Sequence, residues 1–428
     1  MNQDPRSHGL WADSAPPGPD TSYLGVGEPA VDVLVIGGGF TGLSAALHLS
    51  QGGARVAVLE AQELGFGASG RNVGLVNAGL WLMPESLPFL LGPVYGPRLL
   101  RILDHAPDLV YQLVQRHDMQ CQAVRNGTLH CAVGAAGFRE IRARWQQWKQ
   151  LGAPVELLDA DATARALGTA AYRGSLLDHR AGTIQPLAYV RGLAQAAVRA
   201  GARLYTHSRV RAVNDGGTHW QVWTDQGKID TSWVLVATDA YTQDIWPELQ
   251  RQQIRLPYFN MATRPLDKRQ YAHILPKGEG AWDTRKMLSS FRLDQDGRLI
   301  FGSVGALRGV GTRIHENWGR RALSRLFPEL GRVEFDYEWY GHIGMTSDAL
   351  PRLHQLARHT VSISGYNGRG IAPGTVLGRE LARLILGQID MADMPLPLTE
   401  PARAPLKSAR EALYEYGAMA AHAASDRF

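Results

Sequence analysis

Cysteine is scarce in this sequence, occurring only as Cys121 and Cys131 in 428 residues. Two cysteines cannot build a disulfide framework, and their spacing matches no zinc-binding pattern. We therefore predict two buried thiols in a reducing compartment and no metal site.

Hydrophobic runs long enough to cross a membrane are also missing. The most apolar stretch, residues 87–91, contains Pro88 and is closed by Gly92 and Pro93. It is far shorter than the roughly 18 residues that a spanning helix needs. Residues 1–29 are rich in proline and have no apolar signal core, which predicts a loose lead-in. These absences predict a cytoplasmic protein and leave open a peripheral contact with a membrane.

Runs of like charge are absent as well. Lys and Arg number 45 against 40 Asp and Glu, and the net charge of +5 is dispersed along the chain. This pattern excludes the basic arms that bind nucleic acid. Hydrophobic residues make up 45% of the chain, enough to bury a large interior, and the length predicts two to three folding units.

Glycine, by contrast, is abundant, and its 47 residues gather in clusters. The strongest cluster, residues 37–42, follows an apolar run at 31–36 that is typical of a buried parallel strand. A helix is expected over 43–49, and a second strand over 55–60. Strand, glycine turn, helix and strand in this order predict a dinucleotide-binding unit.

Each residue type in this unit has a physical reason. Gly37 permits the tight turn, Gly39 lets the backbone approach a pyrophosphate, and Gly42 lets the helix pack on the strand. The helix N-terminus offers N–H groups and a positive dipole end to phosphates. Glu60 ends the second strand, where a carboxylate can accept both ribose hydroxyls. This unit alone does not distinguish FAD from NAD.

Two further glycine loops favour FAD. One covers residues 65–74, and the other covers 364–370 between a strand at 361–363 and a helix expected over 375–386. The loop at 364–370 places another helix N-terminus far along the chain. A nicotinamide coenzyme has little use for it, whereas a helix N-terminus can stabilise the negative charge of a reduced flavin.

These segments resemble the D-amino-acid oxidase superfamily of FAD-dependent amine oxidases, which includes glycine, sarcosine and γ-glutamylputrescine oxidases. The resemblance extends from about residue 29 to residue 416. Within the superfamily, the sequence is most similar to bacterial L-pipecolate oxidases. The segments that carry the likeness are 37–46, 67–72, 71–79, 178–184 and 365–370.

The resemblance implies a mixed α/β and α+β fold, in which a Rossmann-like FAD-binding domain is interleaved with an antiparallel-sheet substrate domain. The FAD-binding domain is expected to comprise 30–80, 150–255 and 340–400, and the substrate domain 81–149 and 256–339. A C-terminal linker and helix, with the helix near 408–416, are expected within 401–428.

The resemblance also implies a set of cofactor-binding residues in the glycine loops and at strand ends. They are Gly37, Gly39, Phe40, Thr41, Gly42, Glu60, Ala61, Ala68, Ser69, Gly70, Arg71, Asn72, Val73, Gly74, Leu75, Val210, Gly368, Arg369, Gly370 and Ile371. Sarcosine oxidases attach the flavin to a cysteine in the segment that is 340–346 here. This chain has no cysteine there, so we expect FAD to be held noncovalently.

Two departures from the family pattern are visible. Asp239 stands where the family usually has glycine, and Ile371 begins an apolar stretch where the L-pipecolate enzymes are expected to be more polar. The second departure leaves the substrate open.

The implied activity is oxidation of a carbon–nitrogen bond by hydride transfer to flavin N5, which requires no catalytic acid or base. A carboxylated substrate calls for an arginine fork, and Arg369 is the first candidate. Ser290, Tyr258, Met261 and His342 are expected to line the substrate pocket, with a weaker case for His342 as a general base. The preferred reaction is L-pipecolate to 1-piperideine-6-carboxylate, with oxygen or a respiratory acceptor receiving the electrons.

Three alternatives remain from the sequence. An enzyme of the same fold would oxidise γ-glutamylputrescine or a similar amine. A non-enzymatic flavin-binding protein would bind a partner. A nicotinamide dehydrogenase would use only the first glycine motif.

Overall fold

The computed structural model describes residues 8–243 and 245–424. The strands on either side of the first glycine motif, β1 and β2, are neighbours in the first sheet. Five parallel strands form its centre in the order β18-β11-β1-β2-β8, and β17, β10 and β9 add antiparallel strands. The strands are β1 (Val31–Ile36), β2 (Val56–Leu59), β8 (Arg203–Tyr205), β9 (Ala212–Asp215), β10 (Trp220–Trp223), β11 (Lys228–Val236), β17 (Arg352–Ala357) and β18 (Thr360–Ser364).

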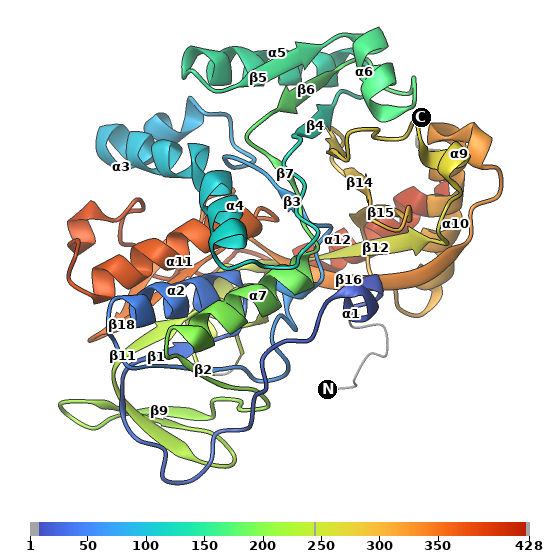
Figure 1. Cartoon of the computed structure of the whole chain (residues 1–428). Helices are drawn as coiled ribbons and strands as arrows, with labels where there is room; N and C mark the ends of the chain where they lie inside the picture. The colour runs from blue at the N-terminus through green and yellow to red at the C-terminus, as the bar shows by residue number, and fades with distance from the viewer. Residues whose placement is uncertain (1–7, 244, 425–428) are drawn as a thin grey trace.

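Helices from three distant parts of the chain pack together on this sheet. In Figure 1 the blue α2 (Phe40–Gln51), the green α7 (Pro186–Arg199) and the orange α11 (Ile371–Ile385) lie side by side. β1 is almost wholly buried, as expected of a parallel strand covered on both faces. The remaining helices of this half are α3 (Ser86–Asp104), α4 (Ala106–Arg116) and α8 (Pro247–Gln252).

The second sheet has eight strands in the order β16-β12-β15-β14-β13-β4-β6-β5, and all its pairs are antiparallel except β13 with β4. The strands are β4 (Thr128–Cys131), β5 (Val155–Leu158), β6 (Ser175–Asp178), β12 (Ile254–Thr263), β13 (Gly280–Asp283), β14 (Ser289–Leu293), β15 (Leu299–Val304) and β16 (Phe335–Met345). The associated helices are α5 (Gly134–Gln150), α6 (Ala160–Leu167), α9 (Lys268–Tyr271) and α10 (Val310–Leu326).

Several short elements complete the fold. β3 (Leu75–Val76) pairs with β7 (Gly182–Thr183) in a separate two-stranded sheet. The 3-10 turns are η1 (Ala68–Gly70), η2 (Asp239–Tyr241), η3 (Pro328–Leu330) and η4 (Met391–Asp393). This is the expected fold class, a Rossmann-like domain interleaved with a largely antiparallel sheet.

The domain boundaries differ from the sequence-based expectation in several stretches. α3 and α4, expected in the substrate domain 81–149, pack against α11 of the first half. Residues 340–345, expected in the FAD-binding domain, complete β16 in the second sheet. Residues 150–178 were assigned to the FAD-binding domain, yet β5 and β6 pair with each other and with β4 in the second sheet. The chain returns to the first sheet only at α7. Pairing partners decide this assignment, and a short apolar strand is compatible with either sheet.

The N-terminal segment is also better ordered than its proline content suggests. Residues 1–7 lie outside the description, but α1 (Leu10–Ser14) buries both Leu10 and Trp11. The Trp11 indole N–H donates to the Asn72 carbonyl at 2.9 Å, and its ring meets Trp339 edge-on. The prediction of a loose lead-in is therefore wrong from Gly9 to Ser14, because a large buried aromatic ring outweighs the prolines that follow it.

The C-terminal helix α12 (Lys407–Ala424) is longer than the predicted 408–416 and packs against β12 and α10. Glu415 forms two hydrogen bonds of 2.6 Å with the Arg308 guanidinium. Near the helix end, the Nδ1 atoms of His315 and His422 lie 2.8 Å apart, and the His422 ring stacks on Trp318. Among the described residues, no helix has the length and hydropathy needed to cross a bilayer.

We expect acid to loosen the attachment of α12. Burial lowers the pKa of His315 from 6.5 to about 4 and that of His422 to about 3, with the neighbouring His315 and Arg321 adding to the second shift and Glu415 opposing the first. Both rings are therefore neutral when docked. Their stabilising contribution is complete above pH 6.5 and is lost as the pH falls toward 4, by up to about 3 kcal/mol per pH unit for the pair.

Limited proteolysis of α12 between pH 7 and pH 5 measures this effect. Cleavage in the wild type should accelerate with acidification, and the double variant His315→Phe and His422→Phe should show a much weaker pH dependence. An equal acceleration in both proteins would contradict the assignment to this pair.

Candidate functional site

A cavity of about 1190 Å³ is lined by residues from both large sheets. Its volume exceeds the roughly 300–1,000 Å³ of a pocket for one small ligand. The strands β1, β2, β12, β14, β15 and β16 all contribute residues to its wall. The cavity is therefore large enough for a long cofactor together with a substrate.

The first glycine motif forms one wall of the cavity and admits no side chains at two positions. Gly37 has φ of 114°, and a Cβ there would lie 2.6 Å from the Ala237 carbonyl oxygen. A Cβ on Gly42 would lie 2.1 Å from the Gly37 carbonyl oxygen. Gly42 thus lets α2 pack against the turn, which places the helix N-terminus at the cavity.

The third glycine loop, residues 364–370, contacts the first, as expected if both bind one cofactor. The hydroxyls of Thr41 and Tyr366 lie 2.7 Å apart, and both are buried. One turn into α2, the Ser44 hydroxyl donates to the Thr375 carbonyl at 2.7 Å. The N-terminus of α11, at Gly370 and Ile371, lines the same cavity as that of α2. Two positive helix ends therefore face one ligand site.

Glu60 lies at the end of β2 and lines the cavity. Its carboxylate accepts hydrogen bonds from the N–H groups of Gly38 at 2.8 Å and Gln62 at 3.0 Å. Burial raises its pKa, and these backbone donors oppose that effect. The backbone contacts hold the carboxylate where ribose hydroxyls can donate to it.

The second loop, residues 65–74, is stiffened by its own polar side chains. The Arg71 Nε donates to the Phe66 carbonyl at 2.7 Å, and its Nη1 donates to the Tyr340 carbonyl at 3.1 Å. The Asn72 amide donates to the Ala68 and Ser69 carbonyls. Both residues line the cavity while connecting the loop to itself and to β16.

Asp239, the departure from the family's glycine, keeps the backbone conformation that glycine favours, with φ of 41°. Its carboxylate accepts the Gly365 N–H at 2.7 Å, which joins the end of β11 to the third glycine loop. Burial raises the pKa of Asp239 to about 6, although three backbone N–H groups oppose the shift. The substitution thus adds a contact with that loop, which offsets the strained φ.

Arg369 occupies an aromatic corner of the cavity. Its guanidinium carbon lies 4.7 Å from the centre of the Trp282 ring and 5.0 Å from that of Trp81. Its Nη1 donates to the Ala78 carbonyl at 2.8 Å, and its buried Nε has no acceptor among the described residues. Burial lowers the pKa of Arg369 to about 9, and the positive charges of Arg144 and Arg180 add to the shift.

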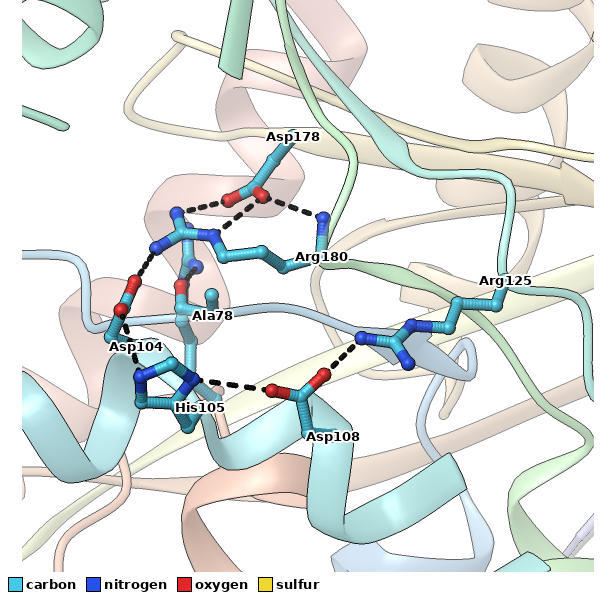
Figure 2. A network of polar contacts seen from close by, with 8 residues as sticks. Ala78, Asp104, His105, Asp108, Arg125, Asp178 and Arg180 are labelled. Atoms are coloured by element: carbon cyan, nitrogen blue, oxygen red, sulfur yellow. Dashed lines mark hydrogen bonds and ion pairs between the residues drawn. The ribbon is translucent and has the colours of Figure 1, made fainter. Parts of the chain in front are cut away.

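A network of ions supports this corner (Figure 2). Arg180 pairs with Asp178 at 2.6 Å and also with Asp104, and its guanidinium lies 4.1 Å from the Trp148 ring centre. Figure 2 shows the chain of contacts continuing from Asp104 through His105 and Asp108 to Arg125, with Ala78 beside it. The segment 178–184, singled out by the family resemblance, therefore connects the second sheet to α3, and His105 extends the network to α4.

The other predicted substrate contacts divide into two groups. Tyr258, Ser290 and His342 line the cavity, and the Tyr258 and Ser290 hydroxyls lie 2.7 Å apart. Met261 is absent from the wall and is fully buried in the core beneath the second sheet. Side chains alternate along β12, so a residue three positions from Tyr258 points to the opposite face. The prediction for Met261 is corrected accordingly.

His342 is poorly suited to act as a general base. Burial, together with Arg255, Arg71 and Arg308, lowers its pKa to about 3. A group with such a pKa is neutral at physiological pH and a weak proton acceptor. The structure therefore supports only a wall position for this residue.

Most of the predicted cofactor contacts line the cavity. The exceptions are Gly42, Gly70 and Gly74, which pack behind the wall against the carbonyls of Gly37, Gly65 and Ile184. Sequence reasoning missed a set of lining residues that come from other elements. They are Trp81, His130, Tyr241, Trp282, Leu413, Tyr414 and the turn from Asp283 to Leu288.

The cavity fits FAD on structural grounds: two helix N-termini, a carboxylate at the end of β2 and a glycine turn that excludes side chains all face it. The profile of the DAO family, described as FAD dependent oxidoreductase, matches residues 32–384.

Relatives with known names and a solved structure agree with that match. Gamma-glutamylputrescine oxidoreductase of Escherichia coli (strain K12) is 32% identical over 85% of each chain. The probable oxidoreductase OrdL of Rhizobium meliloti (strain 1021) is 29% identical over 100% of this chain and 99% of its own. The crystal structure of glycine oxidase from Geobacillus kaustophilus superposes with a TM-score of 0.71 at 19% identity, covering 87% of this chain and 99% of that one. The chain therefore belongs to the DAO family of FAD-dependent oxidoreductases, which act on amines and amino acids.

Proposed function

We propose that the protein oxidises the carbon–nitrogen bond of an amine that also carries a carboxylate. The observation behind this proposal is Arg369, a buried cation in the cavity wall with no ion-pair partner among the described residues and an unpartnered Nε. An uncompensated buried charge is unfavourable, and a substrate carboxylate would compensate it through a charge-assisted hydrogen bond. The N–H of Trp282, also without an acceptor in residues 8–243 and 245–424, adds a second donor nearby.

FAD would be held by the N-termini of α2 and α11, by Glu60 at the ribose and by the loop around Arg71. Bound FAD supplies the hydride acceptor that no side chain provides. Cys121 and Cys131 are buried and do not line the cavity, which supports noncovalent binding.

The chain's own residues would orient the substrate rather than exchange protons with it. Arg369 holds the carboxylate, the Trp81 and Trp282 rings exclude water from that corner, and the Tyr258–Ser290 hydroxyl pair borders the same cavity. Holding the reacting carbon in one position lowers the entropic part of the barrier.

Two substrates follow from different observations. The turn between β13 and β14 brings Asp283, Arg285 and Lys286 to the cavity, and charges of both signs suit a longer substrate such as γ-glutamylputrescine or a related amino-acid amine. This is our first candidate, and it agrees with the E. coli relative. The aromatic side chains of Trp81, Trp282 and His130 give this corner a largely apolar wall that suits the hydrocarbon ring of L-pipecolate, our second candidate.

An anaerobic titration of the purified holoenzyme tests the proposal. We expect the flavin absorbance to bleach with γ-glutamylputrescine or L-pipecolate and to bleach far less with two amines that have no carboxylate: piperidine, which is L-pipecolate without that group, and putrescine, which lacks the whole glutamyl group. Admitting oxygen would then show whether oxygen or a respiratory acceptor takes the electrons. Bleaching by no carboxylated amine would favour the non-enzymatic alternative, and equal bleaching by both sets would contradict the role of Arg369.

A further inference from the structure

Arg144 is a second buried arginine close to the aromatic corner, but it does not line the cavity. It comes from α5 and clamps the segment of residues 80–82. Its Nη1 donates to the Leu82 carbonyl at 3.0 Å and, more weakly, to that of Leu80, while its Nη2 donates to the Trp81 carbonyl at 2.6 Å. No carboxylate in the described part of the chain forms an ion pair with it, so three backbone carbonyls carry its hydrogen bonding.

The clamped residue is the one that supports the carboxylate receptor. The Trp81 indole N–H donates to the Asn367 carbonyl in the third glycine loop. Its ring lies against the Arg369 guanidinium and meets Trp282 edge-on, with ring centres 4.9 Å apart. A shift of the backbone at Trp81 would therefore move both the glycine loop and the ring that positions Arg369.

Arg144 also acts through its charge. It is one of the two cations that add to the burial effect on the pKa of Arg369, while Asp178 opposes them. Like charges behind a receptor strengthen its attraction for an anion in a medium of low dielectric constant.

We propose that Arg144 is a positioning residue for the substrate carboxylate, holding Trp81 against Arg369 and adding positive potential behind it. This inference rests on the proposed function, because it takes Arg369 as the carboxylate receptor. The planar guanidinium of arginine can donate to several fixed carbonyls at once, whereas the lysine ammonium has no such rigid geometry.

The test uses holoenzyme and cyclohexanecarboxylate, which has a ring and a carboxylate but no nitrogen to oxidise. Binding is measured by isothermal titration calorimetry at neutral pH for wild type, Arg144→Gln and Arg144→Lys. The matched control is Arg142→Gln, an exposed arginine on the same helix. Flavin content and circular dichroism verify that each variant is folded.

We expect both Arg144 variants to bind the carboxylate about tenfold more weakly, because the backbone at Trp81 is no longer held and Arg369 is positioned less well. KM for the carboxylated amine should rise with the dissociation constant while kcat changes less than about threefold.

The outcomes separate this inference from the proposed function. Wild-type affinity in both Arg144 variants, together with lost binding in Arg369→Leu, would overturn the inference and leave the proposed function standing. Wild-type affinity in Arg369→Leu would overturn the proposed role of Arg369. If Arg144→Gln does not fold, Trp81→Phe, which keeps a ring but loses the bond to Asn367, should weaken binding in its place, and unchanged affinity there would contradict the inference.

Discussion

Replacing Gly42 by alanine is expected to yield a folded protein that retains little of its FAD. The new Cβ would lie 2.1 Å from the Gly37 carbonyl oxygen, closer than any van der Waals contact, so α2 must move away from the turn. Overpacking of this kind costs about 1–3 kcal/mol or more. Because the displaced element is the helix N-terminus that lines the cavity and is expected to bind the FAD phosphates, we expect FAD affinity to fall by at least about tenfold.

The ratio of flavin to protein absorbance after purification, followed by titration with added FAD, measures this loss. Gly25→Ala is the matched control, because a Cβ on Gly25 meets nothing within 4 Å. Circular dichroism separates weak FAD binding from failure to fold. A Gly42→Ala protein as yellow as the control would show that the close contact between turn and helix is unimportant for the cofactor.

Replacing Arg369 by leucine should produce the largest change in substrate preference. Removing one partner of a buried charge pair costs about 2–5 kcal/mol, which corresponds to roughly 30-fold to several thousand-fold in KM for a carboxylated amine. The rise in KM should be nearly as large for Arg369→Lys. Lysine keeps the charge but lacks the planar guanidinium that lies against Trp81 and Trp282.

Steady-state kinetics with paired substrates tests this expectation. An amine without a carboxylate serves as the internal control, and its KM should change less than about threefold in either variant. Equal losses for both substrates would indicate a general disturbance of the site. Unchanged kinetics would show that the carboxylate binds elsewhere.

Features carried by one continuous segment of the chain were the easiest to predict from the sequence. The first glycine unit is contained in one strand–turn–helix–strand segment, so the positions of β1, α2, β2 and Glu60 were predictable within a few residues. The sequence predicted that the first and third glycine loops bind the same cofactor, but it did not predict the contact between Thr41 and Tyr366. These residues are 325 positions apart, and no local pattern links them. Cofactor contacts beyond the glycine loops remain predictions of the family resemblance.

The substrate corner was harder to predict because it has no local pattern. Trp81, His130 and Trp282 come from a loop and two strands, and each is an ordinary aromatic residue in its own segment. The prediction for Met261 was wrong because the sequence does not show which side chains of β12 point to the cavity and which point to the core. Residues 150–178 were misassigned because the partners of β5 and β6 are distant in sequence.

By itself, the sequence determined the chemistry that the protein can support: a glycine turn with no room for side chains, an acid at the end of the following strand, and no cysteine in the segment where sarcosine oxidases attach their flavin. These properties depend on neighbouring residues and on the conformations that glycine allows. The tertiary structure alone supplied the physical support for Arg369 as a candidate carboxylate receptor, because the proposal rests on its burial, on two tryptophan rings and on the lack of an ion-pair partner within the part of the chain that the structure describes. Desolvation depends on everything that surrounds a group, and that surrounding is assembled only when distant segments pack together.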